Sequence, residues 1–250
     1  MTKEILYLGD TVLKEAASYL AGIMAHHKIS FDYLPSEAQF TDAIYRDKHR
    51  AFVISDFPSK NFQPDHLEKM ADRVLEGAGL LMIGGWESFT GLGGDYGDTA
   101  LQAILPVELM PQDDRVNSAQ PCLVEKLQEH PILTDLPFDT VVPGIGGYNR
   151  VRAKTGASEL LAARRFSVTH GPKGFIFDPA AAADPLLVVD TVGTGRVGAF
   201  ASDVAPHWVG GLVDWGDARV NACGEGANPV EVGNWYARFF AQLIRWIAQL

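Results

Sequence analysis

Residues 84–89 place polar and aromatic side chains directly after a glycine pair, in the order Gly-Gly-Trp-Glu-Ser-Phe. Gly84 and Gly85 lack a Cβ atom, so a ligand could approach their backbone closely. Trp86 could stack on a flat-faced ligand, and Ser88 could donate or accept a hydrogen bond. A second glycine-rich loop at residues 91–99 contributes Tyr96 to the same region. We interpret the two loops as a binding site for a small molecule.

A second group of residues with chemical capability lies in the segment from Asp203 to Trp208. Histidine is the side chain whose unperturbed pKa lies closest to neutrality, so His207 could serve as an acid, a base or a ligand anchor, with Asp203 as the carboxylate that orients it. Trp208 could stack on the same ligand as Trp86. Asp56 and Asp203 could accept hydrogen bonds from ligand hydroxyl groups. We therefore predict that His207 and Asp203 act at the same site as the glycine loops.

The sequence gives weaker signals for metal binding and for dinucleotide binding. Asp203 and His207, together with Asp214 and Asp217, could bind a divalent cation, but they do not form a compact ligand motif. The string GxGxxG at residues 193–198 precedes a strand instead of opening a helix, which is the wrong context for a dinucleotide. We accordingly expect no cofactor and no metal.

The elements that must position these residues alternate strand and helix. Strands are predicted near residues 5–8, 30–34, 51–55 and 79–84, with helices near 11–25, 37–45 and 64–76. The apolar run at residues 80–83 is typical of a central strand buried on both faces. Ligands of open α/β sheets bind beyond the carboxyl ends of the strands, where Asp56 and residues 84–88 would lie.

The second half of the chain shows shorter, less regular signals. Strands are predicted at residues 122–127, 158–163, 186–190 and 196–201, loops at 110–120 and 203–229, and an amphipathic helix at 230–250. We predict one domain over residues 1–250. Its fold class is α/β, flavodoxin-like, with a mainly parallel sheet flanked by helices and antiparallel strands added in the second half.

The composition limits the partners. The chain has 250 residues and a net charge of −10, which argues against nucleic acid and anionic membranes as general partners. It shows no signal-peptide pattern and no membrane-length apolar run, and its two cysteines form no disulfide framework, so a cytoplasmic protein is expected. The expected partners are a small-molecule ligand and further copies of the chain, through residues 203–229 and the last helix.

Three stretches together resemble the class I glutamine amidotransferase-like superfamily, specifically its family of putative glutamine amidotransferases, and more distantly the trehalose-utilisation-type proteins. The stretches are residues 84–89 with 93–96, residues 149–151 with 156–157, and residues 195–197 with 201–203 and 206–208. The resemblance implies the flavodoxin-like fold predicted above.

The resemblance also implies roles for individual residues. Gly84-Gly85 resembles the loop that donates N–H groups to an oxyanion in true amidotransferases, with Trp86 in place of a proline. Cys122 is near the expected nucleophile but lacks the glycines of a nucleophile elbow, and Val209 stands where the glutamate after His207 is expected. The resemblance therefore implies a scaffold without the Cys-His-Glu triad, and the aromatic and carboxylate residues named above predict that it binds a small polar ligand such as a sugar.

Two alternatives stay open at this point. One is an active glutamine amidohydrolase with Cys122 as nucleophile and His207 as base. The other is a non-catalytic protein that assembles into a homo-oligomer.

Overall fold

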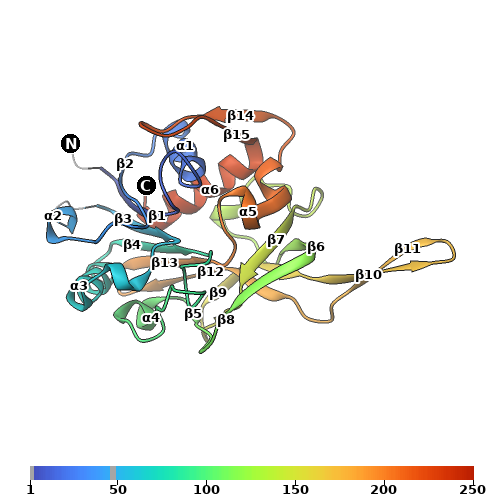
Figure 1. The fold of residues 1–250 in the computed structure, drawn as a ribbon, viewed down its shortest axis with the longest axis horizontal. Coiled ribbons are helices and arrows are strands. Elements are labelled where there is room, and N and C mark those ends of the chain that lie inside the picture. Colours follow the sequence, from blue (N-terminus) through green and yellow to red (C-terminus); the bar gives the residue numbers. More distant parts are fainter. Residues whose placement is uncertain (1–2, 46–48) are drawn as a thin grey trace.

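The computed structural model describes residues 3–45 and 49–250, and within them a nine-stranded sheet forms the centre of the protein (Figure 1). The strand order is β2-β1-β3-β4-β13-β12-β9-β6-β7. The strands are β1 (Ile5–Gly9), β2 (Phe31–Leu34), β3 (Ala51–Ser55), β4 (Gly79–Ile83), β6 (Arg115–Lys126), β7 (Gly144–Asn149), β9 (Ser158–Arg164), β12 (Asp184–Val192) and β13 (Gly195–Phe200).

The sheet has a parallel half and an antiparallel half. Strands β2, β1, β3, β4 and β13 are parallel neighbours, while β12, β9, β6 and β7 continue the sheet antiparallel to one another. Every residue of β4 is buried and the strand lies between β3 and β13. The predicted central strand and the predicted α/β fold class are therefore confirmed.

Helices cover both faces of the parallel half (Figure 1). Helices α1 (Ser18–His26) and α6 (Asn234–Ala248) pack together on one face, and α3 (Pro64–Leu75) and α4 (Ala100–Ile104) lie on the other. The remaining helical elements are short: α2 (Asp42–Tyr45), α5 (Pro206–Val209) and the 3₁₀ turns Ser59–Asn61, Pro131–Leu133 and Gly210–Asp214. Of these, α5 and Gly210–Asp214 pack against β7 of the antiparallel half. Among the described residues, no helix combines the length and apolar character needed to cross a membrane.

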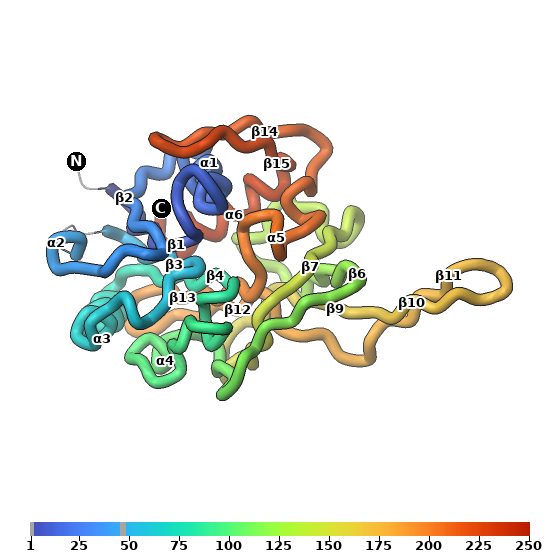
Figure 2. Tube along the Cα trace, viewed as in Figure 1, coloured from blue at the N-terminus to red at the C-terminus, as the bar shows by residue number. Residues whose placement is uncertain are grey.

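Three strand pairs lie outside the central sheet. These pairs are β5 (Val107–Glu108) with β8 (Arg152–Ala153), β14 (Arg219–Ala222) with β15 (Val230–Gly233), and β10 (Phe166–Gly171) with β11 (Gly174–Pro179). The β10–β11 hairpin projects from the body as an arm, which the tube trace follows from base to tip (Figure 2).

Several predicted boundaries are wrong. The first helix begins at Ser18 instead of residue 11, because Asp10 and Thr11 adopt positive φ angles that end β1 in a turn. The helix near 37–45 shrinks to α2, and the last helix begins at Asn234 because residues 230–233 pair with β14. The predicted loop at 110–120 contains the start of β6, and β7, β10 and β11 were not predicted.

Close packing of β4 against α6 generates a first prediction. A Cβ atom added at Gly79 would lie 2.2 Å from the Ile247 carbonyl oxygen, so Gly79→Ala must displace the helix backbone. We expect a loss of about 1–3 kcal/mol in unfolding free energy, measured by urea denaturation. Gly97→Ala is the matched control, since a Cβ there meets nothing within 4 Å. Equal stability of the two variants would contradict the packing argument.

Candidate functional site

Three aspartates meet at the carboxyl edge of the parallel half. Asp10 follows β1, Asp56 follows β3 and Asp203 follows β13. One carboxylate oxygen from each lies within 4.8 Å of the other two. Among the described residues, this is the one group of His, Cys, Asp or Glu side chains close enough together to hold a metal ion. Asp10 and Asp203 are buried, at 1% and 6% exposure, and Asp56 is partly buried. The parallel topology explains the meeting, because it brings the ends of parallel strands to one edge.

The backbone around the cluster is tightly fitted. Asp10 and Asp56 have left-handed φ angles of 59° and 46°, which turn the chain sharply at the strand ends. A Cβ atom at Gly85 would lie 2.0 Å from Oδ1 of Asp56, so the carboxylate occupies the space that a side chain would fill. The Glu87 N–H donates to Asp56 Oδ1 at 2.7 Å, and the Val204 N–H donates to Asp203 Oδ1 at 2.6 Å.

Burial raises the pKa of all three carboxyl groups, and repulsion between like charges adds to the rise at Asp10 and Asp56. Burial, followed by the charge of Asp203, raises the pKa of Asp56 to about 7. Burial also raises the pKa of Asp203 to about 6, against backbone N–H donors and the nearby His207, which lower it. The pKa of Asp10 lies well above its ordinary value, through burial and then the charges of Asp203 and Asp56. The cluster therefore holds protons near neutral pH unless a cation replaces them.

The same geometry shows what the cluster could hold. Three carboxylate oxygens at this spacing are hard oxygen ligands of the kind that Mg²⁺ and Ca²⁺ take, with water completing the shell. The alternative cation set considered from the sequence, in which Asp214 and Asp217 join Asp203 and His207, does not form among the described residues. Asp214 pairs with Arg219 at 2.5 Å, and Asp217 accepts a hydrogen bond from Asn234 at 2.9 Å.

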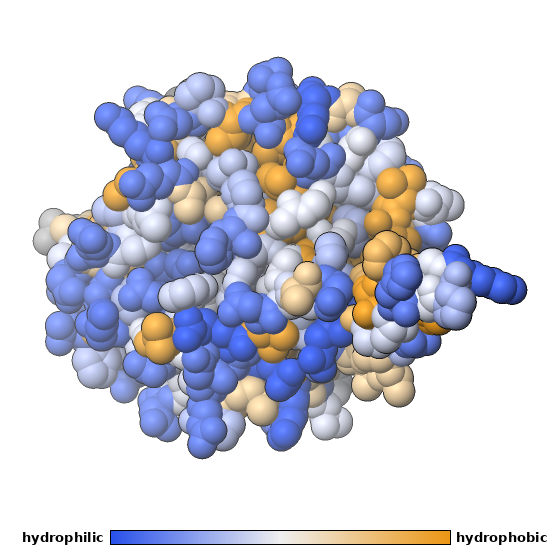
Figure 3. All heavy atoms as spheres, turned by 45° about the vertical axis from the view of Figure 1, so that its right-hand side comes forward, coloured by the Kyte–Doolittle hydropathy of each residue, from blue (hydrophilic) through white to orange (hydrophobic). Residues whose placement is uncertain are grey.

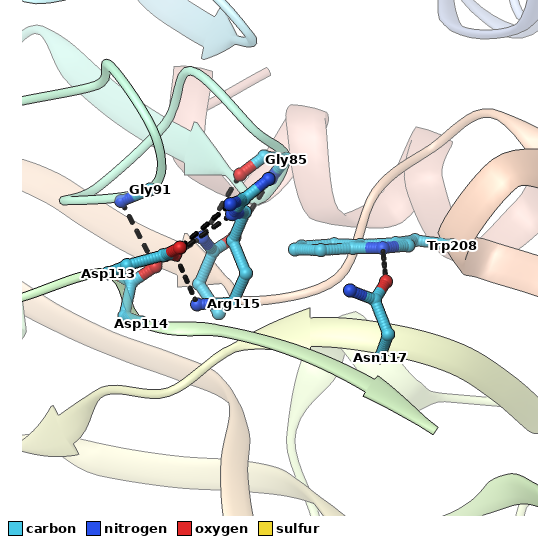
Figure 4. A network of polar contacts seen from close by, with 8 residues as sticks. Gly85, Gly91, Asp113, Asp114, Arg115, Asn117 and Trp208 are labelled. Carbon is cyan, nitrogen blue, oxygen red and sulfur yellow. Dashed lines mark hydrogen bonds and ion pairs between the residues drawn. The ribbon is translucent and has the colours of Figure 1, made fainter. Parts of the chain in front are cut away.

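A buried asparagine fixes the glycine loop above the cluster. Asn149, at the end of β7, accepts from the Gly85 N–H at 2.8 Å and donates to the Gly85 carbonyl oxygen at 3.0 Å. Its Nδ2 also donates to Asp114 Oδ1 at 2.7 Å, and Asp114 accepts from the backbone N–H groups of Thr90 and Gly91. Figure 4 shows Asp113, Asp114 and Arg115 gathered beside Gly85. One side-chain network thus joins both glycine loops to the antiparallel half.

Trp86 forms an aromatic wall beside the carboxylates. It is 43% exposed, the Arg115 guanidinium lies 4.4 Å from the centre of its ring, and the His207 ring lies 6.2 Å away, edge-on. Arg115 is itself held by two hydrogen bonds to Asp113. A cavity of about 580 Å³ opens here, and its lining is Thr11, Val12, Glu15, Ser36, Glu37, Asp56, Trp86, Glu87 and Leu92. Asp56 connects this cavity with the carboxylate cluster.

The other aromatic residues of the predicted site are buried. Tyr96 is fully buried and its hydroxyl donates to the Phe57 carbonyl oxygen at 2.5 Å. Trp208 is buried over Gly147, and its indole N–H donates to Asn117 at 2.8 Å, as Figure 4 shows. Ser88 is also buried and accepts from the Asp56 N–H at 2.9 Å. These three side chains stabilise the loops, whereas Trp86 presents free surface.

The structure does not bring together Cys122, His207 and free Gly84-Gly85 amides, the groups that the hydrolase alternative requires. Cys122 is buried within β6 opposite Ile145, and burial raises the pKa of its thiol. Among the described residues, no hydrogen bond or ion pair joins Cys122 to His207, which is exposed on α5. The Gly84 N–H is taken by carbonyl oxygens of Phe200 and Ser202. With the Gly85 N–H bound to Asn149, neither glycine amide points free toward an oxyanion.

Sequence reasoning missed Asp10, Asp114 and Asn149. Asp10 could have been found, because it follows a predicted strand just as Asp56 does. Asp114 lay in a segment interpreted as a loop. Asn149 was noted only as part of a resembling stretch, and its role requires a contact across 64 residues of chain.

The fold and the carboxyl-edge site define an α/β protein of the class I glutamine amidotransferase-like type. The chain belongs to the family described as putative glutamine amidotransferase, whose model matches residues 8–220. No sequence among the curated proteins is similar enough to this chain to count as a match.

Solved structures show the same fold. Cytoplasmic Protein STM1381 from Salmonella typhimurium LT2 is 29% identical with a TM-score of 0.74, covering 97% of this chain and 98% of its own. Cytoplasmic Protein STM3548 from Salmonella typhimurium is 24% identical with a TM-score of 0.75, covering 98% of both chains. A ThuA-like protein from Parabacteroides merdae is 12% identical, with a TM-score of 0.57 and coverage of 99% of this chain and 90% of that one. The last agrees with the trehalose-utilisation-type resemblance.

Removing the Asn149 side chain provides a test of the loop network. Asn149→Ala leaves the buried N–H and carbonyl groups of Gly85 unpaired and takes one donor from Asp114, so we expect a loss of about 2–4 kcal/mol in unfolding free energy. Chemical denaturation measures it. Asn117→Ala removes a single bond from an exposed residue and should cost less than about 1 kcal/mol. Similar costs for the two variants would show that the network contributes little.

The raised pKa values predict a pH-dependent stability. Unfolded carboxyl groups titrate near 3.8, whereas folded Asp56 titrates near 7, so the folded state binds more protons between these values. Stability from this source is full below pH 4 and is lost as pH rises through 7. In the presence of a chelator, Asp56→Asn should therefore gain on the order of 1 kcal/mol over the natural chain between pH 5 and pH 8. Glu37→Gln, in the same cavity but outside the cluster, is the control.

The measurement is the melting temperature across this pH range, repeated with Mg²⁺. A natural chain that Mg²⁺ stabilises strongly at pH 8, with the effect lost in Asp56→Asn, would show a cation in place of shared protons.

Proposed function

We propose that the protein binds a small, hydroxyl-rich ligand, such as a sugar, in the cavity between Asp56 and Trp86. The observation that carries the proposal is that Asp56 both lines this cavity and belongs to the cluster of three carboxyl groups, whose raised pKa values favour bound protons near neutral pH. A carboxyl group in this state both donates and accepts hydrogen bonds, which matches a hydroxyl group. The exposed Trp86 face supplies the stacking surface that sugar rings and other flat-faced ligands use.

His207 is proposed as an anchor or proton-transfer group at the edge of this site. It lies beside Trp86 and close enough to Asp203 to lower the pKa of that carboxyl group. Carboxyl groups with pKa values of about 6 and 7 are suited to general acid–base chemistry at neutral pH, so the bound ligand could also react there. The expected cytoplasmic location is supported by the two similar Salmonella proteins, which are named as cytoplasmic proteins.

The proposal excludes glutamine hydrolysis as the present activity. Its support is the raised thiol pKa of Cys122 and the engaged N–H groups of Gly84 and Gly85. A thiolate and a free oxyanion site are both needed for that chemistry.

A thermal-shift screen of sugars, polyols and amino acids tests the proposal. We expect a sugar or polyol to raise the melting temperature of the natural chain by several degrees at about one hundred times its Kd. Trp86→Ala should abolish this shift because the stacking face is lost, and Trp86→Phe should retain part of it. His207→Gln changes an exposed residue, so it should weaken binding while leaving the unliganded melting temperature nearly unchanged.

Two outcomes would contradict the proposal. The first is the absence of any shift with sugars and polyols, or a shift that survives in Trp86→Ala. The second is ammonia release from glutamine that disappears in Cys122→Ser, since this would establish the hydrolase alternative.

A further inference from the structure

The β10–β11 arm has one face rich in aromatic side chains, called the apolar face, and a more polar face that includes Ile176. Its register places Phe166 opposite Pro179, Val168 opposite Phe177 and His170 opposite Phe175 on one face. Because side chains alternate along a strand, the remaining pairs point to the other face: Ser167 with Asp178, Thr169 with Ile176, and Gly171 with Gly174. Ring contacts of Phe166 with Phe177 and of His170 with Phe175 agree with a shared face.

The apolar face is uncovered in a single chain. Phe175 is 70% exposed and Phe177 is 62% exposed, because the arm extends away from the body (Figures 1 and 2). A two-stranded hairpin is only marginally stable in water by itself, and large aromatic side chains gain the most from burial. Figure 3 shows hydrophobic residues gathered where the arm leaves the body.

A groove at the base of the arm matches its tip. The groove has a volume of about 360 Å³, its exposed surface is apolar, and its lining is Leu123, Arg164, Phe166, Phe177 and Pro179. Phe175 stands at the opposite end of the same face, next to the turn at residues 172–173. The arm therefore has an apolar groove at its base and an exposed phenylalanine, Phe175, near its tip.

We propose that two copies of the chain associate by packing the apolar faces of their arms against each other in antiparallel orientation. In this arrangement Phe175 of each copy enters the base groove of the other, so a single two-fold axis satisfies both ends at once. The apolar face of the arm carries no Asp, Glu, Lys or Arg, and the one charged side chain that lines the groove, Arg164, is already paired with Glu125, so two chains of net charge −10 can meet without burying an unpaired charge. The inference is independent of the proposed ligand.

The size of the face sets the strength of the contact. The exposed aromatic and aliphatic groups offer roughly 400–500 Å² per copy, or roughly 800–1,000 Å² in total. This lies at the low end of specific interfaces, so the dimer should be reversible and dissociate in the micromolar range. The segments predicted from sequence as an interface are less suitable, because the aromatic face of α6 is buried within the chain itself.

Sedimentation velocity over roughly 1–200 μM of the full chain tests the proposal. We expect a shift from monomer to dimer in the natural chain. Phe175→Glu with Phe177→Glu should raise the dissociation constant at least about tenfold, because it places charge in the apolar contact. Ser167→Glu with Thr169→Glu adds equal charge to the polar face of the same arm and should leave the dimer intact. Circular dichroism and melting temperature confirm that both variants fold.

An engineered disulfide tests the orientation of the arms. In a Cys223→Ser, Cys122→Ser chain, Leu123→Cys with Phe175→Cys should form intermolecular disulfides on mild oxidation, whereas Leu123→Cys with Thr169→Cys should not. A chain that stays monomeric up to the highest concentration would overturn the proposal. So would a dimer that is unaffected by charge on the apolar face, or one in which the Leu123–Phe175 cysteine pair does not cross-link.

Discussion

Crowding at the carboxyl end of β4 is the constraint on which the site depends. A Cβ atom at Gly84 would lie 2.2 Å from the Ala201 carbonyl oxygen, and one at Gly85 would lie 2.0 Å from Asp56. Bare backbone therefore lets β13 and the Asp56 carboxylate approach β4 from either side. Asp56 lies against this loop, where its Oδ1 accepts a hydrogen bond from the backbone N–H of Glu87. A carboxylate oxygen of Asp203 lies within 4.8 Å of those of Asp56 and Asp10.

This arrangement directs the loop's polar groups inward. In an acyl-transfer enzyme, backbone N–H groups would face a reacting carbonyl group. Here the Gly85 N–H is bound to Asn149 and the Glu87 N–H to Asp56, so the loop stabilises carboxyl groups of the protein itself. The family scaffold is retained, while the polar groups at its edge bind side chains of the protein itself, consistent with a fold that does not fix a function.

The two halves of the sheet contribute different properties. The parallel half supplies the three aspartates, and the antiparallel half supplies Asn149 and, through β6, Arg115 behind Trp86. Asn149 and Arg115 link the two halves at the site through hydrogen bonds and a cation–π contact with residues distant in sequence. The site is consequently a property of the whole sheet, whereas the β10–β11 arm is a separate strand pair that projects from the body away from the site (Figure 1).

Short stretches of sequence were enough to predict the α/β class, the central position of β4, and the location of Asp56, Trp86 and Asp203 at strand ends. The reason is that apolar runs and glycine turns are patterns of consecutive residues. It failed for the boundaries of the first and last helices, where turns and the β14–β15 pairing override helical periodicity. Only the tertiary structure decided that Asp10 joins the carboxylates, that Tyr96 and Trp208 are buried, and that Asn149 clamps Gly85. These features depend on which strand ends become neighbours in the folded sheet. Contacts between residues so far apart in the chain cannot be inferred from any short stretch of sequence.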